Sequence, residues 1–159
     1  MEARITGHRR CGLIARTVFW LSLLFYVCSF ALPAFDIVID QQPSSSFGYQ
    51  AFLIGIMAPF SSPYYGGPRA FASWLANPLF WWGTFQSARY RCRQASIAGG
   101  LATILAASLL IGEGNKCLLR EGYYVWLMSM GMFALVSTWW WRNSRTSSEM
   151  GSSCIIVDN

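Results

Sequence analysis

Long apolar runs, separated by short polar segments, restrict the fold of this chain more than any other feature. The main runs are Leu13–Phe35, Ala70–Phe85, Ala95–Gly112 and Gly122–Trp141. Their lengths approach the ~20 residues that a helix needs to cross a ~30 Å hydrocarbon core. Only 12% of the residues are charged, about half the ~25% of a soluble domain. The sequence therefore predicts an all-α fold with lipid as its solvent.

The first apolar run follows a basic leader, as a secretory signal peptide would. Ser29 and Ala31 offer a small-x-small cleavage site, so cleavage is one interpretation. The stretch from Thr17 to Phe35 is 19 residues, however, which exceeds the ~7–15 residues of an ordinary signal core. It is also rich in bulky aromatic residues. We therefore predict a retained membrane span.

The stretch between the first span and the basic segment near residue 90 contains two apolar pieces. Gly48–Phe60 is short for a span, and we interpret it as a re-entrant or interfacial helix. A turn-rich string with two Pro and two Gly follows, and then the second span, Ala70–Phe85. Asn77 and Pro78 interrupt this span, because proline removes a backbone donor. In the alternative interpretation both pieces cross the bilayer, which gives five spans.

The positions of the basic residues favour four spans. Arg89, Arg91 and Arg93 form a dense cluster, and such clusters remain cytoplasmic. With a cytoplasmic N-terminus the polar loop Asp36–Ser46 lies outside, so an odd number of crossings must precede Arg89. The sequence thus predicts a transmembrane four-helix bundle (residues 1–143) in a bacterial inner membrane, with both termini cytoplasmic. Residues 144–159 form a Ser-rich tail that we expect to be disordered.

The third span carries small residues at helical spacing. Ala95, Gly99, Thr103 and Ala107 recur every four positions, and Ala98, Ala102 and Ala106 accompany them. Small residues let helices approach closely in lipid, where packing drives association. This face is expected to pack within the chain's own bundle, and self-association into a homo-oligomer is the alternative.

Residues that support catalysis or metal binding are sparse. His8 is the single histidine, the five cysteines form no CxxC motif, and no phosphate-binding glycine loop is present. No catalytic residues, metal site or cofactor are therefore predicted, and we expect no enzyme. Most of the arginines lie at the ends of apolar runs, so the net charge of +5 reflects membrane topology rather than nucleic-acid binding.

The remaining site candidates are polar residues near the membrane and its outer face. Asn77, beside Pro78 and close to Trp74, is expected to cap backbone groups that the proline leaves free. Alternatively, it faces a small aqueous cavity or a partner. The outer segments carry further candidates that pair with each other or form a recognition surface, namely Asp36, Asp40, Glu113, Arg120 and Glu121.

Two segments resemble a loose group of small bacterial inner-membrane proteins. They are Trp74–Gly83 (WLANPLFWWG) and Gly122–Met130 (GYYVWLMSM). The resemblance extends over roughly Leu13 to Trp141 and implies a four-span architecture with a basic loop. It implies no particular activity.

Three functions fit these features. The first is a non-enzymatic protein that binds a membrane-acting partner, such as an immunity protein against a pore-forming bacterial toxin. Its motivation is the small size, the absence of charge inside the predicted spans apart from Arg16 near an end, and the small-residue helix faces. The second is a small channel or passive transporter, because irregular backbone at membrane depth often lines a cavity. The third is an accessory subunit of a larger membrane complex.

Overall fold

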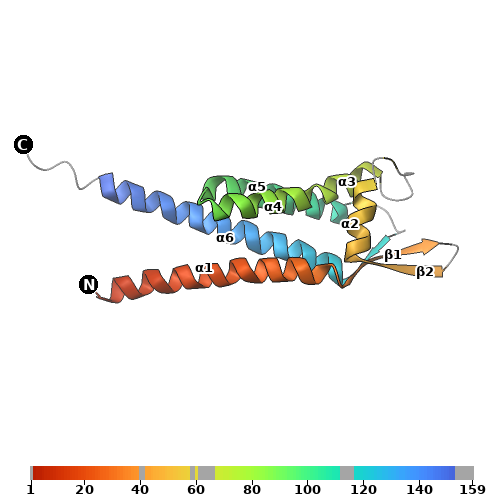
Figure 1. Cartoon of the computed structure of the whole chain (residues 1–159), viewed down its shortest axis with the longest axis horizontal. Helices are drawn as coiled ribbons and strands as arrows, with labels where there is room; N and C mark the ends of the chain where they lie inside the picture. Colours follow the sequence, from red (N-terminus) through yellow and green to blue (C-terminus); the bar gives the residue numbers. More distant parts are fainter. Residues whose placement is uncertain (1, 40–41, 58–59, 61–66, 112–116, 153–159) are drawn as a thin grey trace, which may run out of the picture.

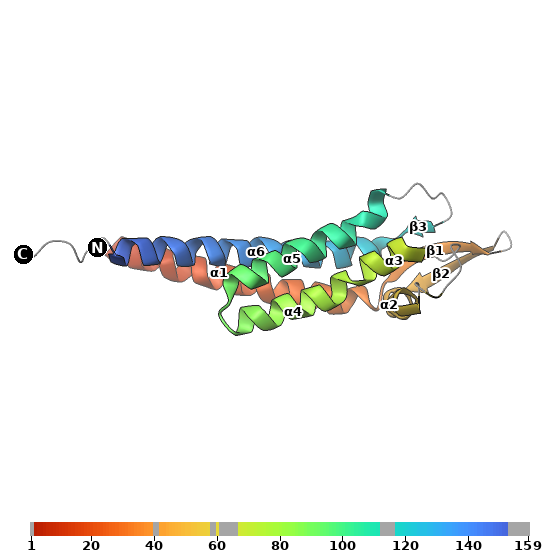
Figure 2. The same ribbon diagram turned by 90° about the horizontal axis from the view of Figure 1, so that it is seen from above.

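A computed structural model describes residues 2–39, 42–57, 60, 67–111 and 117–152. The fold is mostly helical and elongated (Figure 1). Four segments run along the long axis: α1 (Glu2–Ser29), α3 (Gly67–Trp74) continued by α4 (Ala76–Ala88), α5 (Cys92–Ala107) and α6 (Glu121–Ser152). The start of α1 and the end of α6 lie at one end of the molecule, and the turn between α4 and α5 faces the same end (Figures 1 and 2).

The opposite end carries a small sheet and a crosswise helix. Strands β1 (Pro33–Ile39), β2 (Gln42–Phe47) and β3 (Cys117–Leu119) pair antiparallel in the order β2-β1-β3. Helix α2 (Gly48–Met57) follows β2 and lies across the long axis (Figure 1). A short 3₁₀ helix, η3 (Ser108–Ile111), ends α5. The position of α2 agrees with the expectation of a short helix before the second lengthwise segment.

The sheet was not expected from the sequence. The described parts of the predicted polar loop Asp36–Ser46, residues 36–39 and 42–46, lie within β1 and β2, whose register pairs Phe35 with Ser46. The first helix ends at Ser29, six residues before the predicted end of the span at Phe35. Pro33 opens β1, a position where its missing N–H costs no ladder hydrogen bond. The fold is therefore mostly helical, which is compatible with the all-α prediction, and one small three-stranded sheet is added at one end.

The second predicted span consists of two helices in sequence. Helix α3 ends at Trp74 and α4 begins at Ala76, with Leu75 between them. Pro78 lies in the first turn of α4, where a missing N–H is tolerated best. The Asn-Pro pair thus lies close to the break, which is slightly earlier than the sequence suggests.

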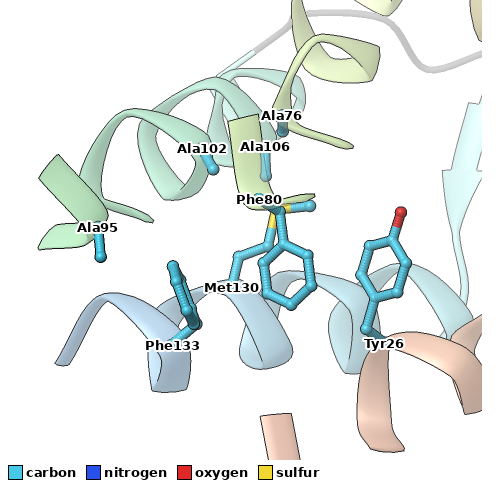
Figure 3. Close-up of a cluster of buried hydrophobic side chains, with 8 residues drawn as sticks. All are labelled: Tyr26, Ala76, Phe80, Ala95, Ala102, Ala106, Met130 and Phe133. Carbon is cyan, nitrogen blue, oxygen red and sulfur yellow. The ribbon is translucent and has the colours of Figure 1, made fainter. Parts of the chain in front are cut away.

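The core joins large side chains to small ones. Tyr26, Phe80, Met130 and Phe133 are buried with four alanines from α4 and α5 (Figure 3), namely Ala76, Ala95, Ala102 and Ala106. Phe133 lies between two glycines of neighbouring helices. A Cβ at Gly83 would lie 2.7 Å from Phe133 Cε1, and one at Gly99 would lie 2.9 Å from Cδ1. Both positions must therefore be small.

Many large apolar side chains lie on the exterior of the helices, while several polar side chains are buried between them. Leu135, Ile104 and Trp20 are 73%, 68% and 63% exposed, whereas Ser129 and Ser137 are fully buried. Other exposed apolar side chains lie on all four lengthwise segments, including Leu24, Val27, Trp81, Trp82, Ile97, Leu101 and Met128. A protein in water normally shows the reverse distribution. So many exposed large apolar side chains indicate a non-aqueous environment or a partner.

One helix among the described residues is long and apolar enough to cross a membrane. It comprises Cys92–Leu110, and only 28% of it is buried inside the protein. The core helix of a soluble protein would be mostly buried. Ile14–Ser29 and Gly48–Met57 are shorter apolar helices. Helix α6 extends to Ser152, into the tail for which disorder was expected, and residues 153–159 lie outside the described residues.

Candidate functional site

The side-chain amide of Asn77 lies at the centre of a hydrogen-bonded group from three helices, which we call the Asn77 network. Its Oδ1 accepts from Tyr26 Oη of α1 at 2.9 Å and from Trp126 Nε1 of α6 at 3.0 Å. Tyr26 Oη in turn accepts from Trp81 Nε1 at 3.2 Å. Asn77 is only 5% exposed and Tyr26 only 2%. The network therefore connects α1, α4 and α6 inside the bundle.

The Nδ2 group of Asn77 compensates for a backbone hydrogen bond that is missing at the helix break. Asn77 Nδ2 donates to the carbonyl oxygen of Trp74 at 3.0 Å. In a regular helix that carbonyl would accept from the N–H of residue 78, four positions later. Pro78 has no N–H, so the side chain of Asn77 replaces the missing donor. The geometry agrees with the capping role expected from the sequence, and the two bonds to Oδ1 occupy both of its acceptor sites, while Nδ2 keeps a second N–H beyond the bond to Trp74.

Aromatic packing holds the network in place. The Tyr26 ring stacks on Phe80 with centroids 4.6 Å apart and meets Trp81 edge-on at 5.6 Å. Tyr123 Oη donates to the carbonyl of Ala106 at 2.7 Å and so links α6 to the end of α5. Buried Tyr and Trp need such partners for their polar ends. Tyr26, Trp81 and Trp126 were missed from the sequence, although an aromatic with a polar end inside a span is a signal for this role.

The Trp74 side chain packs against neighbouring residues and makes no polar contact through its indole N–H among the described residues. A Cβ on Gly55 would come within 2.7 Å of Trp74 Cδ1, so α2 and α3 touch closely here. Its ring stacks near Phe71, with centroids 5.9 Å apart. Trp74 Nε1 is buried without a hydrogen-bond partner among the described residues, as are Gln86 Oε1 and Ser137 Oγ.

The predicted small-residue face of α5 packs mainly against α6 and α4. Ala95 and Gly99 are buried, whereas Thr103 and Ala107 are only partly buried. The buried stripe instead continues through Ala98, Ala102 and Ala106. Thr103 Oγ1 donates to the carbonyl of Gly99 within its own helix. Ser96 Oγ lies 2.7 Å from Thr138 Oγ1 and gives α5 and α6 a polar contact.

The charged candidates of the sheet end form one ion pair. Arg120 Nε lies 3.3 Å from Asp36 Oδ2, without the alignment of a hydrogen bond, and the Arg120 side chain is 42% exposed. Asp36 Oδ1 also accepts from Ser45 Oγ at 2.7 Å. Glu121 is exposed at the start of α6. Asp40 and Glu113 lie outside the described residues.

The described residues contain no group of three His, Cys, Asp or Glu side chains that could hold a metal ion. A shallow hollow of about 360 Å³ lies beside α3 and η3, lined by Pro68, Arg69, Ala72 and Ser108. It is open to the surroundings and apart from the Asn77 network.

No protein-family model, curated protein or solved structure matches this chain. The resemblance to small four-span membrane proteins therefore remains a prediction from Trp74–Gly83 and Gly122–Met130.

Proposed function

We propose that this chain is a four-span integral membrane protein that acts by binding a membrane-acting partner, without catalysing a reaction. The observation that carries the proposal is the distribution of side chains in the helical part. Many large apolar side chains face outwards, whereas Ala, Ser and the Asn77 network lie inside, beside a few large apolar residues such as Phe80 and Phe133. In lipid, small and polar residues favour helix association, and apolar residues contact the acyl chains.

The dimensions of α6 support a bilayer position. From Glu121 to Arg142 the helix rises about 32 Å, close to the ~30 Å hydrocarbon core. Tyr123 and Tyr124 lie at one end of this stretch and Trp139–Trp141 at the other. Aromatic residues concentrate at the two interfaces of a membrane. Trp and Tyr also score low on hydropathy scales, which is why α6 does not count among the most apolar helices.

The crosswise helix α2 supplies a candidate partner surface. Tyr49, Leu53 and Met57 are 51%, 58% and 60% exposed and recur every four residues on α2. The Phe47 ring stacks near Tyr49, with centroids 6.1 Å apart, and is also exposed. We call these four residues the α2 stripe. Beside the polar sheet, it suits an amphipathic or membrane-inserted partner on that side of the bilayer.

The Asn77 network supports binding more than conduction. A channel or passive transporter needs polar groups that face water, whereas Asn77 is buried and bonded to three internal partners. Purified protein in liposomes is therefore expected to show no solute flux. If flux appeared and Asn77→Leu abolished it, the channel function would replace the binding function.

Sided labelling of native cysteines tests the membrane topology. The chain has Cys11, Cys28, Cys92, Cys117 and Cys154, and variants that retain one cysteine each are treated with an impermeant maleimide on intact cells. We expect labelling at Cys117 only, with Cys11, Cys92 and Cys154 reacting after the cells are opened. Labelling of Cys92 in intact cells would contradict the four-span arrangement.

Survival assays with a pore-forming toxin test partner binding in its most concrete form, in which this protein confers immunity and a toxin gene is expected in its gene neighbourhood. Cells that produce the toxin are expected to survive when they also produce this protein. Leu53→Ala with Met57→Ala should lose protection, whereas Leu101→Ala with Ile104→Ala, on the outward face of α5, should retain it. Equal survival with and without the protein would exclude this role. Co-purification with other membrane subunits in mild detergent would indicate an accessory subunit instead.

A further inference from the structure

We propose that five arginines at the level of the α4–α5 turn, on the side of the bundle away from the sheet, bind the headgroups of anionic phospholipids. The arginines are Arg16 of α1, Arg89 and Arg91 at the α4–α5 turn, Arg93 of α5 and Arg142 of α6. We call them the arginine belt, and each of them is exposed. The inference rests on the proposed membrane location and adds a lipid partner of defined charge.

Contacts between helices show that these arginines lie at one level. The Phe19 and Trp140 rings are 5.8 Å apart, and Arg16 and Arg142 lie three and two residues beyond them towards the termini. Ser96 contacts Thr138, and Arg93 lies three residues from Ser96 in the same direction. At ~1.5 Å per residue, the three side chains start within about one helical turn along the axis. The α4–α5 turn lies beside Arg93 and faces the same end (Figure 2).

The belt carries charge without nearby acids among the described side chains. The carboxylates whose side chains the structure describes are Asp36 and Glu121, both at the sheet end. Asp36 already pairs with Arg120. Five guanidinium groups of one sign therefore gather at one level of the bundle. Each basic residue near an anionic bilayer surface adds favourable attraction.

The turn at the centre of the belt exposes an aromatic side chain in an unusual conformation. Tyr90 has φ of 59° and is 92% exposed. Arg91 N donates to Gln86 O at 2.9 Å and Tyr90 N donates to Ser87 O at 3.0 Å, which is the pattern of a Schellman helix end. Glycine is preferred at that position, so a bulky Tyr there has a conformational cost. Strain that persists on an exposed residue points to a contact outside the protein.

The neighbouring side chains fit the boundary between headgroups and acyl chains. The Arg89 guanidinium carbon lies 4.1 Å from the centroid of the exposed Phe85 ring. Trp82, Trp20 and Trp139 are also exposed, further along the bundle from the termini than the arginines. Arginine pairs with phosphate through two parallel N–H groups, and aromatic rings occupy the layer just beneath. A nucleic acid would need no such apolar layer.

Lipid retention by the purified full chain tests the proposal. The protein in neutral detergent is mixed with equal amounts of phosphatidylglycerol and phosphatidylcholine, and bound lipid is counted by native mass spectrometry. We expect phosphatidylglycerol to be retained on the order of tenfold more than phosphatidylcholine. Arg89→Gln with Arg91→Gln and Arg93→Gln should bring the ratio close to one, whereas Arg69→Gln, near the sheet end, should leave it unchanged.

Several results would overturn the inference. These are equal retention of both lipids by the unaltered protein, an unchanged preference in the triple variant, and displacement of the lipid by inorganic phosphate or by an RNA oligonucleotide at matched charge. Carbonate extraction of cell membranes tests the membrane location separately. If the protein stays in the membrane fraction but shows no lipid preference, the lipid inference is wrong and the proposed membrane location stands.

Tyr90→Gly provides a second test that does not depend on charge. Removal of the strained side chain should raise the thermal stability and lower phosphatidylglycerol retention about twofold. Raised stability with unchanged retention would mean that Tyr90 makes no lipid contact and would remove it from the proposal.

Discussion

Two regions of the same bundle hold the helices together by different means. In the glycine seam, Gly83 and Gly99 surround Phe133, and contact depends on shape alone. In the Asn77 network, Tyr26, Trp81 and Trp126 depend on hydrogen bonds to one another or to a single amide. In the membrane location proposed above, neither region would gain from the hydrophobic effect, because acyl chains are as apolar as the core. Substitutions in the two regions measure whether packing or polar bonding contributes more to stability.

The glycine seam should be the more sensitive region. At Gly99 a Cβ would lie 3.1 Å from the backbone Cα of Ala134, so a larger residue must push α6 away. Gly99→Leu is therefore expected to cost about 3 kcal/mol or more. The measurement is the unfolding midpoint in mixed micelles of SDS and mild detergent. Gly100→Ala is the matched control, since nothing lies within 4 Å of its added Cβ, and it should be neutral or slightly stabilising.

Asn77→Ala should cost about 2 kcal/mol, because two buried donors and the Trp74 carbonyl lose their partner. Part of this cost should vanish when Pro78 is also replaced by Ala, since residue 78 regains an N–H for the Trp74 carbonyl. A double-mutant cycle over Asn77 and Pro78 measures that coupling. Strict additivity would contradict the role of Asn77 as a substitute donor. Thr84→Ala, which loses only a bond to its own helix, is the control.

The Ser96–Thr138 contact should contribute less than the Asn77 network. Interhelical hydrogen bonds between hydroxyl groups in membranes average about 0.6 kcal/mol. Thr138 also donates to the Ala134 carbonyl, so it retains a partner when Ser96 is removed. The coupling in a cycle of Ser96→Ala and Thr138→Val is expected near that value. A coupling above the cost of Asn77→Ala would reverse the ranking of polar contacts.

The smallest effect is expected at the Asp36–Arg120 ion pair. Its exposure limits the contribution to roughly 0.2–1 kcal/mol, and salt should weaken it further. Thermal unfolding of Asp36→Asn at low and high salt checks this value. The difference from the unaltered protein should shrink as salt rises. A salt-independent loss would instead indicate that the bond from Ser45 to Asp36 matters more than the charge.

The sequence predicted the local features of the bundle better than its long-range contacts. The Asn77–Pro78 pair indicated a helix break, and the polar amide beside it indicated a cap, because both effects act within four residues. The starts of α5 and α6 were also placed within three residues. Helix ends of this kind follow from proline, charge and the loss of apolar residues.

The missed features all join distant segments. Phe35, Ile37 and Ile39 alternate with other residues as a strand requires, but the partner strand Gln42–Phe47 is too polar to stand out. The third strand comes from residues near position 118, about 80 positions further along the chain. Likewise, Asn77 meets Tyr26 and Trp126 across about 50 residues on either side. No local pattern specifies such pairs.

The pairing of β1 with β3 has a consequence for the order in which the chain is made. Arg120 N donates to the carbonyl of Ala34, and a Cβ on Gly122 would lie 2.7 Å from the carbonyl oxygen of Pro33. Strand β1, which follows the first helix, can therefore pair with β3 only after most of the chain has left the ribosome. Until then, one edge of β1 remains open to foreign strands. A product that stops before Arg120 would carry that open edge permanently and become a natural target for membrane proteases.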